Sequence, residues 1–151
     1  MPNTKAVGVA FSDPELVAGT TITGAAISNS TITGGTMAGA TLTGASLSVD
    51  VAKPAAAGST RADATAMTAS FNWVTAADAT KGVVLPAPTA GRLLVVKNDD
   101  TANAILKVYA PGSAKINGVA GTTAFSMAAK TACWFVAYDT TDWFSVPLVA
   151  S

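Results

Sequence analysis

A large aliphatic residue recurs at every fifth position through the N-terminal third of this chain. The members of this pentad row are Val17, Ile22, Ile27, Ile32, Met37, Leu42 and Leu47. A period of five fits neither the α-helix, with about 3.6 residues per turn, nor the β-strand, whose side chains alternate between two faces. A fixed period outside both values indicates short repeats that stack on one another.

The positions around each aliphatic residue are also regular. A small or hydroxyl residue stands two positions before most members of the row, and Thr, Ser or Ala follows most of them directly. Two positions after members of the row stand Gly24, Asn29, Gly34, Gly39 and Gly44. Glycine and asparagine accept the positive φ that a tight turn often requires. This order resembles the pentapeptide-repeat family, and the resemblance implies a square β-helix with the aliphatic side chains inside.

The pentad row is too short to cover itself. Its seven members would make fewer than two coils of a square β-helix, whereas about three stacked units are needed for a stable repeat core. We therefore expect the row, within residues 16–49, to be completed by other chains. It would either intertwine in a trimer or lie along a partner surface, and it is the predicted assembly interface.

Two further segments flank the pentad row. Residues 1–15 form a predicted arm, in which only Val7, Val9 and Phe11 alternate like a short strand. An arm of this kind has little to bury against itself, so it is either disordered or ordered by a neighbour. Residues 50–66 are small, polar and without a period, which is typical of a linker.

The remainder, residues 67–151, consists of short strands separated by turn residues. The predicted strands are residues 70–75, 82–85, 92–97, 104–109, 131–138 and 143–148, with an Asn-Gly hairpin turn at 117–118. No segment between them has apolar residues at the spacing of an amphipathic helix. We predict an all-β fold, in which the short pentad-repeat segment is β-helix-like and this C-terminal domain is an antiparallel β-sandwich or small barrel.

The residue types that carry most enzyme chemistry are scarce. The chain contains no histidine and one cysteine, which removes Ser-His-Asp arrangements and zinc sites. The acidic pairs Asp99-Asp100 and Asp139 with Asp142 could offer oxygen ligands to calcium, but we interpret them as turn residues. Cys133 lies in an apolar run and is predicted to be a small buried hydrophobe. We expect no enzyme, no metal and no cofactor.

Charge and hydropathy narrow the range of partners. Only 12% of residues are charged and the formal net charge is +0, whereas ordinary soluble domains carry about 25% charged residues. A neutral surface exerts no long-range attraction on nucleic acid or anionic membranes. The sequence shows no signal-peptide core and no membrane span. We expect a soluble protein that is made in a cytoplasm and whose faces are covered by copies of itself or by a partner.

The aromatic residues gather in the C-terminal part. The set is Phe71, Trp73, Tyr109, Phe125, Trp134, Phe135, Tyr138, Trp143 and Phe144. Such residues could line a sugar-binding face, but they more often form a core or a subunit interface. We interpret them as core or interface.

The order of short motifs in the C-terminal part carries a second resemblance. The motifs are residues 83–92 (VVLPAPTAGR), 95–98 (VVKN), 106–109 (LKVY), 116–118 (ING), 126–130 (SMAAK) and the strand that Trp143 opens. This order looks like a small β-domain of tailed-bacteriophage virion proteins, including head decorations, head fibres and tail fibres. The resemblance covers about residues 83–146 and implies a homotrimeric virion component without catalytic residues.

Among virion components, the arm, the assembly segment and the compact head favour a capsid decoration protein on the virion surface. Its arm residues Val7, Val9 and Phe11 would contact the major capsid protein, and its pentad row would hold the homotrimer together. A short fibre or receptor-binding tip is the second hypothesis. A carbohydrate-binding module is the third.

Overall fold

The computed structural model describes residues 48–99 and 104–148. The chain divides into two units, and the described residues belong to the second, Ala45–Ser151. The predicted arm and the pentad row therefore lie outside the described residues.

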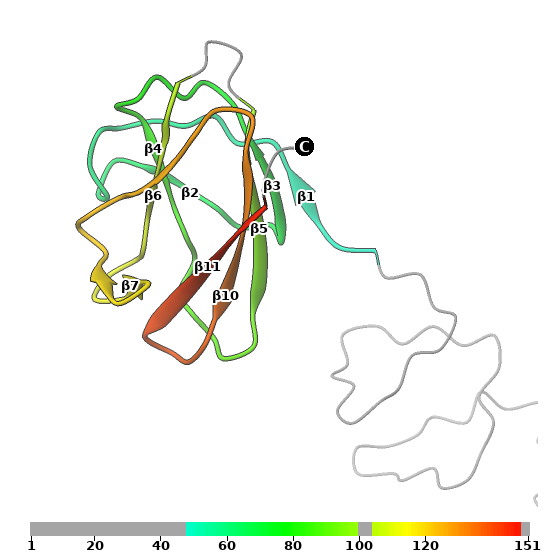
Figure 1. Cartoon of the computed structure of the whole chain (residues 1–151), viewed down its shortest axis with the longest axis vertical. Coiled ribbons are helices and arrows are strands. Elements are labelled where there is room, and N and C mark those ends of the chain that lie inside the picture. The colour runs from blue at the N-terminus through cyan, green and yellow to red at the C-terminus, as the bar shows by residue number, and fades with distance from the viewer. Residues whose placement is uncertain (1–47, 100–103, 149–151) are drawn as a thin grey trace, which may run out of the picture. The chain divides into compact units, whose positions relative to one another are not determined.

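The described residues form strands and connecting loops, with no helix (Figure 1). The strands are β1 (Val51–Ala52), β2 (Thr65–Ala66), β3 (Phe71–Val74), β4 (Gly82–Val84), β5 (Leu93–Asn98), β6 (Leu106–Tyr109), β7 (Lys115–Ile116), β8 (Val119–Ala120), β9 (Phe125–Met127), β10 (Ala132–Ala137) and β11 (Asp142–Leu148). The all-β prediction is confirmed for this part of the chain. Strands β3, β4, β5, β6, β10 and β11 lie within one or two residues of the predicted segments.

The strands make two sheets. One has seven strands in the order β1-β3-β5-β10-β11-β7-β8, and the other has four in the order β2-β4-β6-β9. From β1 to β6 the chain alternates between the two sheets, so neighbouring strands within a sheet are two apart in the sequence and run parallel, as β3 and β5 do. The prediction of an antiparallel domain is therefore wrong in part, because the sheets are mixed. Antiparallel pairing is found for β5–β10, β10–β11, β6–β9 and β7–β8.

Both sheets contribute side chains to one hydrophobic core. Alternate residues of β3 and β10 are buried, as the strand period of two requires. The fully buried hydrophobic side chains include Trp143, Phe135, Leu94, Val74 and Val96 from the seven-stranded sheet, and Val83, Leu106 and Val108 from the four-stranded sheet. Full burial of each such side chain contributes about 1.5–3 kcal/mol.

The predicted Asn-Gly turn is confirmed. It joins β7 to β8, which pair antiparallel through Lys115–Ala120 and Ile116–Val119. Asn117 and Gly118 have φ of 53° and 75°. Two successive positive φ values give the turn whose twist matches that of a hairpin.

The segment 50–66 differs from the linker that its composition indicated. Strand β1 pairs with β3 and strand β2 pairs with β4, both in parallel. Between them, the amide of Ala56 donates to the carbonyl of Thr75 at 2.8 Å, and the Ala56 side chain is buried. Small side chains let this backbone lie close to the sheets, and composition alone cannot distinguish that use of alanine from a flexible connection.

Candidate functional site

The seven-stranded sheet turns one face toward the core and the other toward solvent. Strand registers place Val51, Phe71, Val95, Trp134 and Val146 side by side in one row across β1, β3, β5, β10 and β11. On the same face lie Trp73, Leu93, Val136 and Phe144, one pleat away. We call these nine residues the outer face.

The outer face is unusually apolar for an exposed sheet surface. Trp73 is 44% exposed, Trp134 is 39% exposed and Phe144 is 45% exposed. A sheet face in contact with water usually carries polar residues in alternation with the core residues. Strands that are apolar on both faces are typical of sheets whose two faces are both covered.

The outer face has charged residues at two opposite corners. Beside Trp73, the Nζ atoms of Lys53 and Lys97 lie 5.7 Å and 5.9 Å from the centre of the indole ring, within the range of cation–π attraction. Asp142 is the first residue of β11 and lies on the same face as Phe144, two residues further along the strand. Asp139 precedes it in the turn. The outer face thus has a basic corner at β3 and β5 and an acidic corner at the start of β11.

Asp139 in the acidic corner stays ionised at neutral pH. The Oδ1 atom of Asp139 accepts hydrogen bonds from the amides of Thr141 at 2.6 Å and Asp142 at 2.8 Å. These bonds favour the charged carboxylate and lower the pKa of Asp139 below its ordinary value. The same bonds confirm the interpretation of Asp139 as a turn residue. The part of the chain that the structure describes contains no cluster of three or more His, Cys, Asp or Glu residues that could bind a metal ion.

Two of the hollows on the described surface border aromatic and charged side chains. One, of about 260 Å³, lies on the outer face and is lined by Val51, Phe71, Asn72, Trp73 and Lys97. Its floor is hydrophobic, and the lysine provides a cation at its edge. This hollow could accept an apolar side chain of a partner or the apolar face of a sugar ring.

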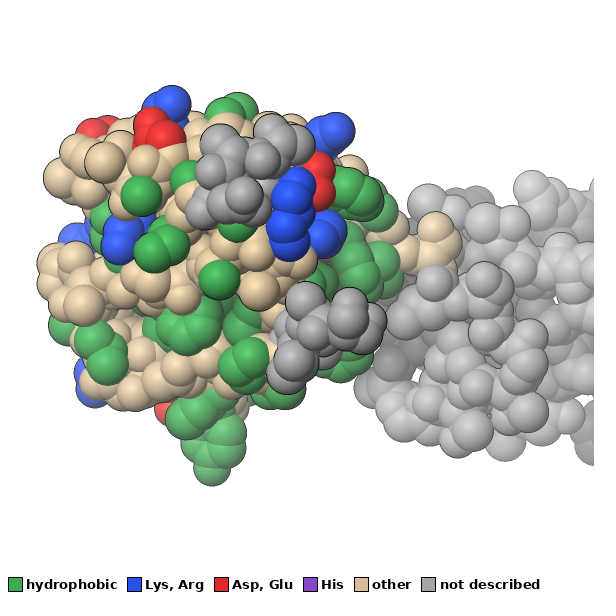
Figure 2. All heavy atoms as spheres, turned by 45° about the horizontal axis from the view of Figure 1, so that its top comes forward, with side chains coloured by type: hydrophobic (Ala, Val, Ile, Leu, Met, Phe, Trp, Pro, Cys, Tyr) green, Lys and Arg blue, Asp and Glu red, His purple; other side chains and the backbone are tan. Residues whose placement is uncertain are grey.

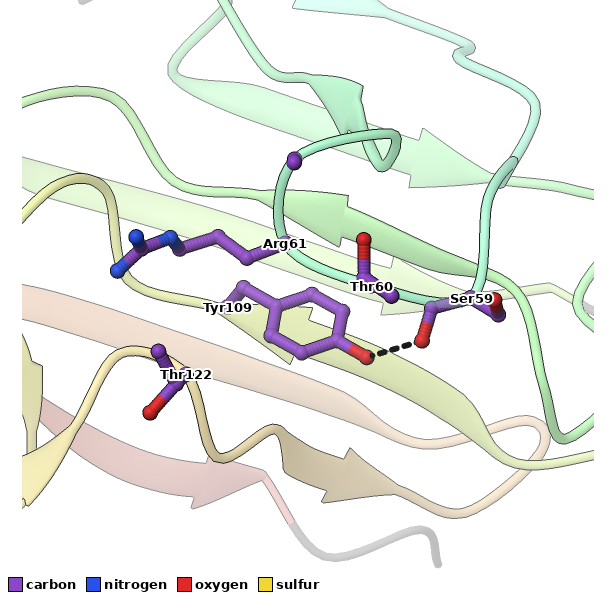
Figure 3. Close-up of a pocket in the computed structure, with 6 residues that line it drawn as sticks. Ser59, Thr60, Arg61, Tyr109 and Thr122 are labelled. Atoms are coloured by element: carbon purple, nitrogen blue, oxygen red, sulfur yellow. Dashed lines mark hydrogen bonds between the residues drawn. The ribbon is translucent and has the colours of Figure 1, made fainter.

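The other hollow, of about 270 Å³, lies between the turn at residues 59–62 and the loop that carries Thr122 (Figure 3). The Tyr109 hydroxyl donates to the carbonyl of Ser59 at 3.0 Å, and Arg61 donates to the carbonyl of Gly112. The Thr60 hydroxyl donates to Asp63 at 2.6 Å. These three polar groups make their hydrogen bonds within the protein. The bonds connect the loops around the hollow, so we interpret the hollow as part of the loop structure and not as a site for a charged ligand.

The side of the described unit that Figure 2 shows is weakly charged. On the side that Figure 2 shows, Lys and Arg side chains are scattered with Asp and Glu side chains near them, and apolar and uncharged surface separates them. This distribution agrees with the low charge content of the sequence. It gives no continuous basic field of the kind that follows a phosphate backbone.

The structure divides the aromatic residues into two groups. Trp143 and Phe135 are fully buried, Tyr109 is 6% exposed and Phe125 packs partly buried against the core, so the interpretation as core is confirmed for these four. Phe71, Trp73, Trp134, Tyr138 and Phe144 are exposed. For this second group, interface and sugar contact are both still open. The alternating pattern of each strand contained the signal, because Trp134 and Phe135 are adjacent and must point to opposite faces.

The single cysteine lies in the core. The Cys133 side chain is buried and forms no disulfide. Burial raises the pKa of its thiol to about 11, because a low-dielectric environment disfavours the thiolate. Its predicted role as a small buried hydrophobe is confirmed.

The predicted assembly and arm residues are not among the described residues. This holds for Val7, Val9, Phe11, Val17, Ile22, Ile27, Ile32, Met37, Leu42 and Leu47. The outer face was not singled out by sequence reasoning, although all its residues except Val51 were among the aromatic and strand positions noted above, and Val51 was in the segment predicted to be a linker.

No protein-family model matches the chain, and a comparison with curated proteins gives no match. Within residues 48–99 and 104–148, no helix is long and apolar enough to cross a membrane.

Proposed function

We propose that this chain is a non-enzymatic structural protein of a bacteriophage particle. In this role it is a homotrimeric capsid decoration protein that binds the major capsid protein from outside and stabilises the shell. The observation that carries the proposal is the apolar outer face of the seven-stranded sheet. A face of this kind needs a protein partner to cover it, and the charge-poor sequence suits a protein whose surfaces are covered in an assembly.

Each part of the chain has a separate role in this proposal. The described unit is a β-sandwich head, which is supported by two sheets that share one core. The pentad row from Val17 to Leu47 joins the three chains. The arm residues Val7, Val9 and Phe11 contact the major capsid protein. Three arms on one trimer turn modest single contacts into strong attachment, because each further contact is made at high effective concentration.

A second function is supported by the hollow beside Trp73. An exposed indole ring with an apolar floor and nearby lysines resembles the stacking platforms on which proteins bind sugar rings. In that case the chain is a carbohydrate-binding module or the receptor-binding tip of a short fibre. This function predicts that Trp73→Ala removes binding to a glycan array without altering the mass of the assembly.

Two measurements test the proposal. The mass of the purified full chain should be that of a trimer. When the protein is added to capsids that lack it, binding should saturate at a fixed stoichiometry. A matched variant without residues 1–15 should keep the trimer mass and lose most of its affinity for capsids. A full chain that fails to bind the capsids, or that binds them without saturation, would refute the decoration role.

A further inference from the structure

We infer that the outer face is the surface on which copies of this chain associate, with the basic corner of one copy against the acidic corner of the next. This inference deepens the proposed function, because it names the surface that holds the homotrimer of head domains together. It is argued from the size of the outer face, the placement of its aromatic residues and the arrangement of its charges.

The first argument is size. The fractional exposures of Val51, Phe71, Trp73, Leu93, Trp134, Phe144 and Val146 give an exposed surface of roughly 700 Å² on this one face. The largest apolar patch on a typical monomer is about 300–600 Å². One partner in a standard protein–protein interface buries about 800 Å². The exposed surface of the outer face is therefore comparable to the largest apolar patches of monomers, and it approaches what one partner buries in a stable interface.

The second argument is the placement of the aromatic residues. Trp134 lies near the middle of the row, between Val95 on β5 and Val146 on β11. Trp73 and Phe144 lie on either side of the row, and the charged residues lie only at the corners. Interfaces have this composition, with aromatic residues at a centre that lacks charge and a polar rim around it.

The third argument is charge, and it selects a second copy as the occupant. Lys53, Lys97 and Lys130 lie at the basic end with one described carboxylate, Asp99. Asp50, Asp139 and Asp142 lie toward the opposite end with two cations: Lys115, the register partner of Asp142 on β7, and Arg92, whose carbonyl accepts from the amide of Ala137. The two ends therefore carry opposite charge, and the chain as a whole has a formal net charge of +0. Copies of this chain do not repel one another, and each carries both halves of a complementary contact.

The opposite charges of Arg92 and Asp50 offset each other. Arg92 precedes β5, and its positive charge helps to lower the pKa of Asp50, after the larger effect of hydrogen bonds from Ser70. This pair gives neither end an excess charge. When each copy offers its basic end to one neighbour and its acidic end to another, the contact is heterologous, and heterologous contacts close into rings when the rotation between copies fits. The charge arrangement therefore suits the cyclic trimer of the proposed function.

The first test places a charge at the centre of the outer face. Trp134→Lys should weaken association of the full chain at least about 30-fold, as the loss of a central aromatic contact does. Val119→Lys is the matched control, because Val119 is 49% exposed on β8 and lies outside the outer face. It should leave association unchanged. Sedimentation velocity over a range of concentrations measures both variants, and near-ultraviolet circular dichroism verifies that each is folded.

The second test does not depend on a change in the apolar surface. Lys97→Glu and Asp142→Lys should each weaken association about tenfold, because each places like charges across the contact. The double variant restores opposite charges and should associate within about threefold of the unchanged chain. If the double variant is weaker than either single variant, the pairing of the two corners is wrong.

The outcomes separate this inference from the proposed function. If Trp134→Lys leaves the strength of association unchanged and the variant still decorates capsids, the inference is overturned and the decoration role remains in place. A trimer that Trp134→Lys dissociates, but whose unchanged form ignores capsids, supports the inference and refutes the decoration role. A full chain that is monomeric at every concentration overturns the inference.

Discussion

Asn98 joins the two sheets through its side chain, and its replacement offers a quantitative test of the fold. The residue ends β5 in the seven-stranded sheet and is fully buried. Its side-chain amide donates to the carbonyl of Met127 on β9 of the other sheet at 3.1 Å and to the carbonyl of Ala104 at 2.9 Å. Asn98→Leu keeps a similar volume and removes both donors.

The expected loss follows from these two bonds. A buried carbonyl that loses its donor costs about 1–3 kcal/mol. Each carbonyl oxygen has a second lone pair that can still accept a hydrogen bond, which reduces the cost. We therefore place the total loss in the free energy of unfolding at about 2–4 kcal/mol. This is a large fraction of the free energy of unfolding of a typical domain, about 5–15 kcal/mol. Asn98→Asp should be worse at neutral pH than in acid, because a buried carboxylate facing two carbonyls has a raised pKa and its cost grows as pH rises above its unfolded value.

The assay is denaturant unfolding of the full chain at one fixed concentration. The control is Thr131→Val, which removes a single hydrogen bond of 2.7 Å from an exposed hydroxyl to Ala128 in the same region. It should change the free energy of unfolding by less than about 1 kcal/mol. A loss below about 1 kcal/mol for Asn98→Leu, or one equal to that of the control, would refute the role of Asn98 as a link between the sheets.

Three further predictions concern the turns and the core. Gly58→Ala should lower the melting temperature more than Gly91→Ala: both glycines have positive φ, at 64° and 80°, but a Cβ at Gly58 would overlap the backbone carbonyl of Asp63, whereas the space around Gly91 is open. Equal losses would contradict the steric argument. Cys133 should resist a thiol reagent at mildly alkaline pH until denaturant is added, because its pKa is raised to about 11 and its side chain is buried; rapid labelling of the folded chain would contradict this placement. Hydrogen bonds from Thr80 and Lys81 lower the pKa of Asp78. The stabilisation of the folded state by this carboxylate is therefore present above the unfolded pKa of about 3.9 and is lost as pH falls toward the lower folded pKa. Asp78→Ala should therefore flatten the acid limb of a plot of melting temperature against pH, and an unchanged limb would contradict the effect.

Local patterns were enough to place most of the strands. The apolar runs in residues 92–97 and 131–138, the Pro-rich stop after Leu85 and the Asn-Gly turn each depend on neighbours in the sequence. The structure confirms these elements to within one or two residues. The burial of Cys133 and the turn role of Asp139 were predictable for the same reason.

The candidate site was less accessible to sequence reasoning. The strands of the outer face are far apart in the sequence, and only their registers bring Val51, Phe71 and Trp134 into one row. A one-residue shift in any register would move these side chains to the core face. The separation of Lys97 and Asp142 to opposite corners depends in addition on the order of the strands.

The sequence by itself determined that this chain has a β-rich C-terminal part, a five-residue repeat near its N-terminus and little charge to attract other molecules. These properties depend on residue types and their spacing. Only the tertiary structure decided which strands pair, that residues 51–66 join the sheets, and which aromatic residues are exposed. The physical reason is that a strand has two faces and two edges, and the choice of face and neighbour is made by contacts between distant segments.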